Sequence, residues 1–214
     1  MHVVITGANR GIGQALDHRF RALGHDVTGT ARNEAEFLKL DVTSPESQAE
    51  AARALDAKPI DLLVCNAGVY LDKGQNLADG FPADMWTQSF AANVTGVFLT
   101  VQSLLPNLQL SATPKIAIIS SQMGSDTRAP GGSYIYRASK AAALNLGRNL
   151  ATDLKHIGIA VGVYHPGWVK TDMGGPDGDI TVTESAEGLA NRFQALSLET
   201  TGCFETWDGR AHPY

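Results

Sequence analysis

The chain has 214 residues, of which 43% are hydrophobic and 18% are charged, and its formal net charge is −5 at pH 7. This is the composition of one ordinary globular domain over residues 1–214. The chain has two cysteines, Cys65 and Cys203, which lack metal-ligand spacing, and we expect them to be intracellular thiols. The acidic balance and the lack of a basic run argue against nucleic acid and anionic membranes as partners.

The chain opens on a short strand, a glycine-rich turn and a helix. The strand is predicted at His2–Thr6, which leaves no room for a signal peptide; since no apolar stretch could span a bilayer either, we expect a cytoplasmic protein. The turn Gly7–Gly13 precedes a helical pattern, Gln14–Leu23, with Gly24 as its C-cap. Backbone amides at such a helix N-terminus receive a phosphate, and the glycines let a pyrophosphate approach closely. A glycine-rich turn without a ligand is the alternative, but the flanking elements favour dinucleotide binding.

Strands and helices alternate through the rest of the chain. Further strands are predicted, from short apolar runs, at residues 27–30, 37–40, 60–65, 115–120, 159–164 and 203–207. Further helices are predicted at residues 44–57, 82–105, 136–154 and 183–196. Ser44 and Pro45 are typical of a helix start, and Pro106 is expected to stop the helix before it.

Near-continuously apolar strands that alternate with helices predict an α/β fold, a doubly wound parallel sheet (Rossmann fold) with helices on both faces. In such a sheet the ligand lies beyond the carboxyl ends of the strands, where the strand order reverses. The glycine turn, Asn66-Ala67-Gly68, Ser121 and Pro166-Gly167 all follow predicted strands. We therefore expect them to converge on one crevice.

Tyr136 and Lys140 lie four residues apart at the start of a predicted helix. On one helix face their Cβ atoms are about 6 Å apart, and an adjacent cation lowers the pKa of a phenol from its usual value of about 10. Such a tyrosine exchanges a proton with a substrate oxygen near neutral pH, and a serine hydroxyl at the neighbouring strand end can hold the same oxygen. Taken alone, Tyr-x-x-x-Lys is also compatible with an ordinary pair on a helix surface.

Seven motifs, in this order, resemble the short-chain dehydrogenase/reductase family along nearly the whole chain. They are Thr6–Gly13 (TGANRGIG), Asp41, Asn66-Ala67-Gly68, Asn93, Ser121, Tyr136-x-x-x-Lys140 and Pro166-Gly167. The segments SQMGS, GGSYIYRASK, HPGWVKTDMGG and WDGRAHPY are most similar to the C-factor and sniffer-type carbonyl reductases. The resemblance implies an NADP(H)-dependent oxidoreductase that transfers hydride between a nicotinamide and a carbonyl or alcohol substrate.

The resemblance also implies a role for each site residue. Tyr136 is the acid/base, Lys140 its cationic partner and a ribose ligand, and Ser121 the donor to the carbonyl oxygen. Asn93 holds a water that connects Lys140 to solvent. The other implied cofactor contacts, of which the last two meet the nicotinamide, are Gly7, Asn9, Arg10, Gly11, Ile12, Gly13, Arg32, Asp41, Val42, Asn66, Ala67, Gly68, Pro166, Gly167, Val169 and Thr171. Family members assemble through the helices of Asn93 and Tyr136, so we expect a homodimer or homotetramer.

Two neighbouring residues are alternatives for these roles. Ser121 lies fifteen residues before Tyr136, a longer spacing than in much of the family. Ser120 is the alternative donor, but it is Ser121 that has Gly124 three residues on, as in the family pattern. Tyr134 is the alternative phenol, but no cation follows it by four residues. We therefore assign Ser121 and Tyr136.

The end of the second strand distinguishes NAD from NADP. An NAD site has a carboxylate about 20 residues after the glycines, where this chain has Ala31 and Arg32. A guanidinium matches a phosphate with two hydrogen bonds, and Arg10 in the glycine turn can approach the same phosphate. Asp41 lies one strand further on, where the resemblance implies an adenine contact. We therefore predict NADP(H) in preference to NAD(H). The alternative is that both arginines are solvated surface charges.

Two functions of different kinds use such a fold. The first is an enzyme that reduces a carbonyl compound, and the second is a dinucleotide-binding sensor or signalling protein without activity. A sensor has no need for Ser121, Tyr136 and Lys140 together. Their presence favours the enzyme.

Overall fold

The computed structural model describes residues 1–214 and is organised around a seven-stranded sheet. Its strands are β1 (His2–Ile5), β2 (Asp26–Ala31), β3 (Leu38–Lys39), β4 (Leu62–Cys65), β5 (Lys115–Ile119), β6 (Ala160–His165) and β7 (Phe204–Thr206). They lie in the order β3-β2-β1-β4-β5-β6-β7, and every pairing is parallel. The order reverses between β1 and β4, so the predicted doubly wound sheet is confirmed.

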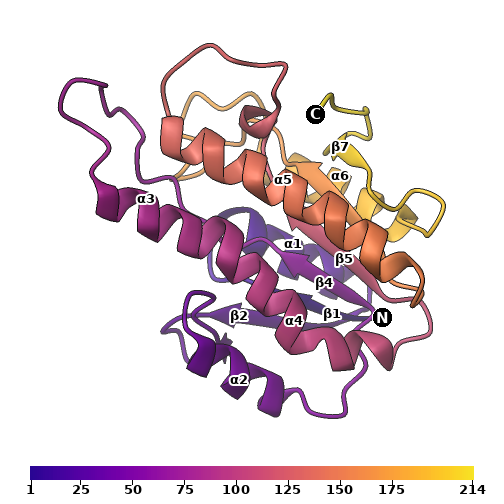
Figure 1. The fold of residues 1–214 in the computed structure, drawn as a ribbon. Helices are drawn as coiled ribbons and strands as arrows, with labels where there is room; N and C mark the ends of the chain where they lie inside the picture. Colours follow the sequence, from indigo (N-terminus) through magenta and orange to yellow (C-terminus); the bar gives the residue numbers. More distant parts are fainter.

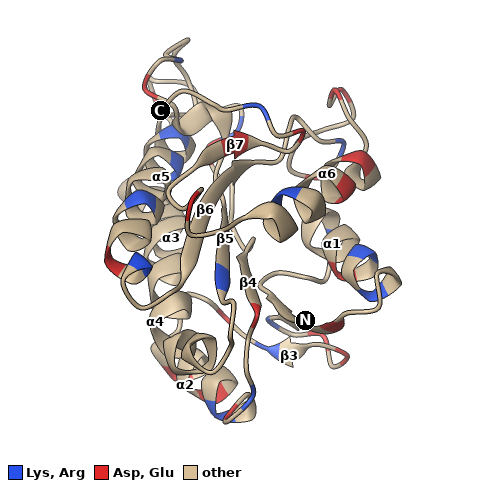
Figure 2. Cartoon of the chain, turned by 90° about the vertical axis from the view of Figure 1, so that its right-hand side faces the viewer, with Lys and Arg blue, Asp and Glu red and all other residues tan.

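Helices cover both faces of this sheet (Figures 1 and 2). They are α1 (Gly11–Ala22), α2 (Pro45–Ala54), α3 (Ala83–Phe90), α4 (Gly96–Gln109), α5 (Tyr134–Lys155) and α6 (Val182–Ala195). Successive side chains of a strand point to opposite faces: Val3 and Ile5 pack with α1 and α6, whereas Val4 packs with α2, α4 and α5. None of the helices combines the length and apolar character that crossing a membrane requires.

The helix predicted at residues 82–105 differs from the prediction in two ways. A π-helical turn, Ala91–Thr95, separates α3 from α4, and α4 continues through Pro106 to Gln109 instead of stopping before it. Asn107 stabilises the last turn of α4 by bonds to another segment of the chain. The Asn107 side-chain amide donates to the carbonyls of Leu55 at 2.6 Å and Lys58 at 3.0 Å. These tertiary bonds compensate for the intrahelical bond that proline cannot donate.

Candidate active site

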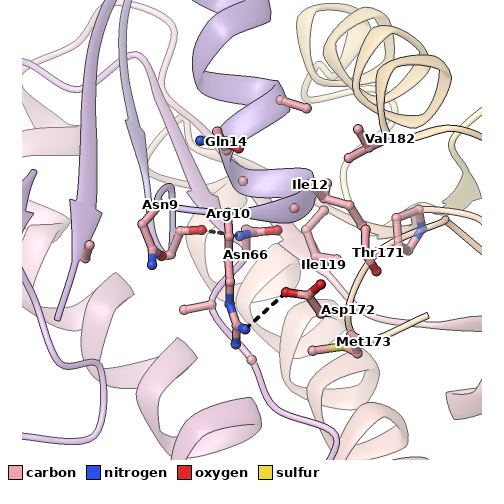
Figure 3. A pocket seen from close by; sticks show the side chains of 18 of the residues that line it. Asn9, Arg10, Ile12, Gln14, Asn66, Ile119, Thr171, Asp172, Met173 and Val182 are labelled. Atoms are coloured by element: carbon pink, nitrogen blue, oxygen red, sulfur yellow. Dashed lines mark hydrogen bonds and ion pairs between the residues drawn. The ribbon is translucent and has the colours of Figure 1, made fainter. Parts of the chain in front are cut away.

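A cavity of about 970 Å³ lies beyond the carboxyl ends of β1, β2 and β4. The glycine turn and the start of α1 form one side of it, and the segment after β6 forms the other (Figure 3). Sixteen of the predicted site residues line it: Gly7, Asn9, Arg10, Gly11, Ile12, Gly13, Arg32, Asp41, Val42, Asn66, Ala67, Gly68, Tyr136, Lys140, Pro166 and Thr171. The structure thus brings together residues from five strand ends.

The glycine turn presents unpaired backbone donors to this cavity. The amides of Gly11, Ile12 and Gly13 precede the first intrahelical bond of α1, and none donates to another group of the chain. A Cβ on Gly13 would lie 2.1 Å from the Gly7 carbonyl oxygen and 2.5 Å from the Asn66 amide nitrogen. Asn66 in turn donates to the carbonyls of Thr6 and Gly7 at 2.9 and 3.1 Å. Asn66 thus holds the turn, and the glycines leave its inner face without side chains. Such a turn fits a pyrophosphate.

Charged side chains line the larger cavity near the glycine turn and the end of β2. Arg32 lies at the end of β2, is exposed and forms no ion pair. Arg10 pairs with Asp172 at 3.6 Å across the cavity mouth (Figure 3). Sequence reasoning missed Glu34, whose carboxylate lines the same cavity and accepts a hydrogen bond from Asn9 at 2.8 Å. The acidic residue Glu34, two residues after Arg32, therefore lies in the site. Ala31 occupies the position where an NAD site usually has its carboxylate.

A second, smaller cavity of about 420 Å³ adjoins the first. It contains three predicted site residues that the larger cavity lacks, Ser121, Gly167 and Val169. Tyr136 lines both cavities, as do Ile12, Pro166, Thr171 and Met173. The phenol therefore lies between a space of dinucleotide size and a space of small-molecule size.

Tyr136 is a buried phenol, and its environment corrects one prediction. Burial raises the pKa of Tyr136 to about 12, although a hydrogen bond with the Ser121 side chain opposes the rise. The ring of Tyr70 stacks on it, with centroids 4.1 Å apart. The predicted lowering of this pKa by Lys140 is wrong for this structure, because removal of the phenol from water disfavours its charged form.

Lys140 is also buried, and its ammonium group is held by the backbone at the end of β5. Its Nζ donates to the carbonyl of Ile119 at 2.9 Å and lies 5.7 Å from the centre of the Tyr136 ring. Burial lowers the pKa of Lys140 to about 8. Its cationic form thus predominates below that pH and its neutral form above it.

The structure separates the two candidate serines. Both are buried. Ser120 lines the larger cavity and its hydroxyl donates to the Lys140 carbonyl at 2.9 Å, whereas Ser121 lines the smaller cavity. Gly124 allows this placement, because a Cβ there would lie 2.6 Å from the Lys140 carbonyl carbon. The turn that follows Ser121 therefore packs directly on the backbone of α5. Tyr134, the alternative phenol, is 40% exposed and lines neither cavity.

Asn93 lies in the π-helical turn, buried behind the cavity wall, and does not line either cavity. Its side chain accepts from the Val69 amide at 2.8 Å and donates to the Val69 carbonyl and the Ser139 hydroxyl, both at 2.9 Å. A Cβ on Gly68 would lie 2.9 Å from the Asn93 side-chain oxygen and 3.5 Å from Lys140 Nζ. Asn93 therefore ties the strand-end loop to α5 beside Lys140. The predicted water contact stays a prediction.

Sequence reasoning also missed Asp72, which holds the start of the helix that carries Tyr136. The N-cap residue of α5, Ser133, has φ 48° and makes no side-chain cap bond. Asp72 replaces that cap from another loop: its buried carboxylate accepts from the amides of Ile135 at 2.8 Å and Tyr136 at 3.2 Å. Residues 69–80 looked like an ordinary loop, so no sequence signal identified this contact.

Replacing Asp72 by Ala is expected to destabilise the fold by about 2 kcal/mol, because two buried amides lose a charged acceptor. Urea unfolding followed by circular dichroism measures the change. Asp84→Ala is the matched control, since Asp84 lies in the first turn of α3, where no side chain caps the helix. Equal losses of about 0.5 kcal/mol or less in both variants would show that Asp72 does not cap α5.

Comparisons with known proteins agree with this geometry. A family model described as short chain dehydrogenase matches residues 1–179. C-signal from Myxococcus xanthus is 37% identical over 157 residues, which cover 73% of this chain and 93% of that protein. The 1-hydroxy-2-glutathionyl-2-methyl-3-butene dehydrogenase from Rhodococcus sp. (strain AD45) is 32% identical over 97% of this chain and 96% of its own. The structure of an NADPH-bound carbonyl reductase from chicken fatty liver is 30% identical, covers 100% and 98% of the two chains, and superposes with a TM-score of 0.90.

Proposed function

Because the chain belongs to the short-chain dehydrogenase family, we propose that it reduces a carbonyl compound to an alcohol with NADPH. The observation that carries this proposal is the position of Tyr136, in the walls of both the larger and the smaller cavity. A proton donor at that junction can reach the oxygen of a carbonyl group whose carbon receives hydride from the neighbouring cavity.

The roles of the site residues follow from their positions. A nicotinamide held in the larger cavity would supply the hydride. Ser121 and Tyr136 hold the carbonyl oxygen by hydrogen bonds, and Tyr136 donates its proton to that oxygen as negative charge develops on it. With a pKa of about 12, Tyr136 carries its proton at neutral pH, as an acid must. Lys140, with a pKa of about 8, contributes a positive charge behind the phenol at the same pH.

The test is steady-state oxidation of NADPH with a panel of aldehydes, ketones and quinones. The proposal predicts turnover with at least one class and formation of the corresponding alcohol or hydroquinone. Tight binding of NADPH without turnover of any carbonyl compound would favour a dinucleotide-binding sensor instead.

The preference for NADPH is part of the proposal, and the NADPH bound to the similar carbonyl reductase from chicken fatty liver supports it. Arg32→Ala is expected to lower kcat/KM with NADPH by about ten-fold or more, since a charge-assisted bond to phosphate contributes about 1.5–3 kcal/mol. The value with NADH should stay almost unchanged, because NADH has no phosphate at that position. Both cofactors are measured with one carbonyl substrate.

Glu34 provides the matched control for Arg32, because it lines the same cavity with the opposite charge. Glu34→Gln removes a repulsion and is expected to keep or raise kcat/KM with NADPH. Equal losses with both cofactors in Arg32→Ala would show that Arg32 does not recognise the phosphate. A wild-type preference for NADH would contradict the assignment of NADP(H).

We also propose that the protein forms a homodimer or homotetramer through α4 and the catalytic helix α5, as in its family. The exposed ring of Phe98 on α4 supports this, since 41% of that large apolar residue is accessible in the single chain. Burying such a residue is favourable.

A further inference from the structure

Three cationic side chains and no carboxylate line the smaller cavity. They are Lys73 in the loop after β4, Arg128 between β5 and α5, and Arg137 in the first turn of α5. The other lining residues are apolar or uncharged. This local excess of positive charge contrasts with the formal net charge of the whole chain, which is −5.

None of the three cations has an ionic partner. The ion pairs of the molecule involve other arginines. Arg137 donates to the carbonyls of Gly132 and Arg128 at 3.1 and 3.4 Å, and Lys73 donates to the Met173 carbonyl at 3.0 Å. Arg128 donates to the neutral side-chain amide of Gln122.

These acceptors fix the side chains without neutralising them. Three oriented and uncompensated charges around one cavity attract an anion.

Acidic residues of the neighbouring segments do not line the smaller cavity. The carboxylate of Asp72 is buried against the amides at the start of α5. Asp172 faces the larger cavity and pairs with Arg10, and Asp126 is exposed and lines neither cavity. None of these three carboxylates lines the smaller cavity.

The same cavity is also lined by a buried polar residue, His165. His165 is 7% exposed, and its Nδ1 is buried without a hydrogen-bond partner. Burial, His212 and then Arg128 lower the pKa of His165 to about 4, so the ring is neutral at physiological pH. The positive field of the rim thus extends to His165, and the cavity wall retains an unpaired polar side chain.

We propose that the carbonyl substrate carries a carboxylate, which Lys73, Arg128 and Arg137 hold while its carbonyl oxygen lies at Ser121 and Tyr136. This inference rests on the proposed function and narrows its substrates to anionic carbonyl compounds that fit about 420 Å³. In the reaction, NADPH is oxidised to NADP⁺ as hydride adds to the carbonyl carbon, and one proton adds to the oxygen. The carboxylate keeps its charge throughout and serves only to orient the substrate.

The experiment compares 4-formylbenzoate with its methyl ester, because the two have the same aldehyde and differ in the charge at the far end of the ring. The wild type is expected to have a kcat/KM for the acid about ten-fold above that for the ester, since charge-assisted bonds orient only the acid. Salt at about 1 M, where the screening length is about 3 Å, should reduce this ratio.

The double variant Arg128→Gln/Arg137→Gln is expected to lower the acid-to-ester ratio by about ten-fold. The ratio corrects for any general loss of activity in the variant. Lys58→Gln is the matched control, since Lys58 is an exposed cation in the turn that precedes β4, away from the cavity; its ratio should equal that of the wild type. A ratio that is the same in the double variant as in the wild type would overturn the inference.

A binding measurement separates this inference from the proposed function. Calorimetry with 4-(hydroxymethyl)benzoate and its methyl ester requires no turnover. Tighter binding of the acid that is lost in the double variant supports the carboxylate site even if neither aldehyde is reduced. Equal binding of acid and ester contradicts it even if both aldehydes are turned over.

Discussion

Tyr136→Phe is expected to lower kcat for carbonyl reduction by a factor on the order of 10²–10⁴, which is the usual effect of losing a positioned proton donor. The change removes only the hydroxyl. The ring remains and still stacks on Tyr70 at 4.1 Å, so the shape of both cavities should be kept. The dissociation constant of NADPH, measured by fluorescence titration, should therefore stay near that of the wild type.

Tyr134→Phe is the control for this prediction, because Tyr134 is on the same helix turn but lines neither cavity. It should retain near-normal activity. If Tyr136→Phe kept more than about half of the wild-type kcat while Tyr134→Phe was inactive, the assignment of the proton donor would be wrong.

Lys140→Met is expected to reduce both rate and cofactor affinity, by about 10²-fold in kcat and about ten-fold in the dissociation constant of NADPH. Methionine has a similar length and fills the buried space, but it carries no charge behind the phenol and cannot donate to a ribose oxygen. Stopped-flow reduction and fluorescence titration measure the two quantities separately. An unchanged dissociation constant would contradict the role of Lys140 as a ribose ligand.

The pH dependence distinguishes loss of this charge from a general structural defect. Since the pKa of Lys140 is lowered to about 8, its cation is present below that pH and is lost above it. The kcat/KM of the wild type should fall as pH rises through about 8, and this fall should be absent in Lys140→Met. Lys155→Met, at the far end of the same helix, should keep the wild-type profile.

The sheet could be predicted because its strands are short apolar runs between turn residues, and this pattern requires no knowledge of tertiary contacts. The convergence of the glycine turn and Asn66-Ala67-Gly68 could also be predicted, because parallel strands place their carboxyl ends at one edge of the sheet. The placement of Ser121 beside Tyr136 followed from motif order, which the family match supports.

What the sequence could not predict depends on contacts between distant segments. Pro106 was expected to end its helix, but Asn107 bonds across to the chain before β4 and keeps the last turn. The pKa of Tyr136 depends on how deeply the phenol is buried. The four-residue spacing between Tyr136 and Lys140 in the sequence does not reveal that burial. Asp72 lies in a loop without a motif, and only the fold brings it to the start of α5.

The most direct test of carbonyl reduction by this protein follows the hydride from NADPH to the product. NADPH with two deuterium atoms on its reactive nicotinamide carbon is supplied to the wild type with 4-formylbenzoate or another aldehyde that is turned over. We expect an alcohol with one deuterium on the former carbonyl carbon, and one alcohol formed per NADPH oxidised. An alcohol without deuterium, or NADPH that binds tightly while no aldehyde or ketone is reduced, would contradict the claim that this protein is a carbonyl reductase.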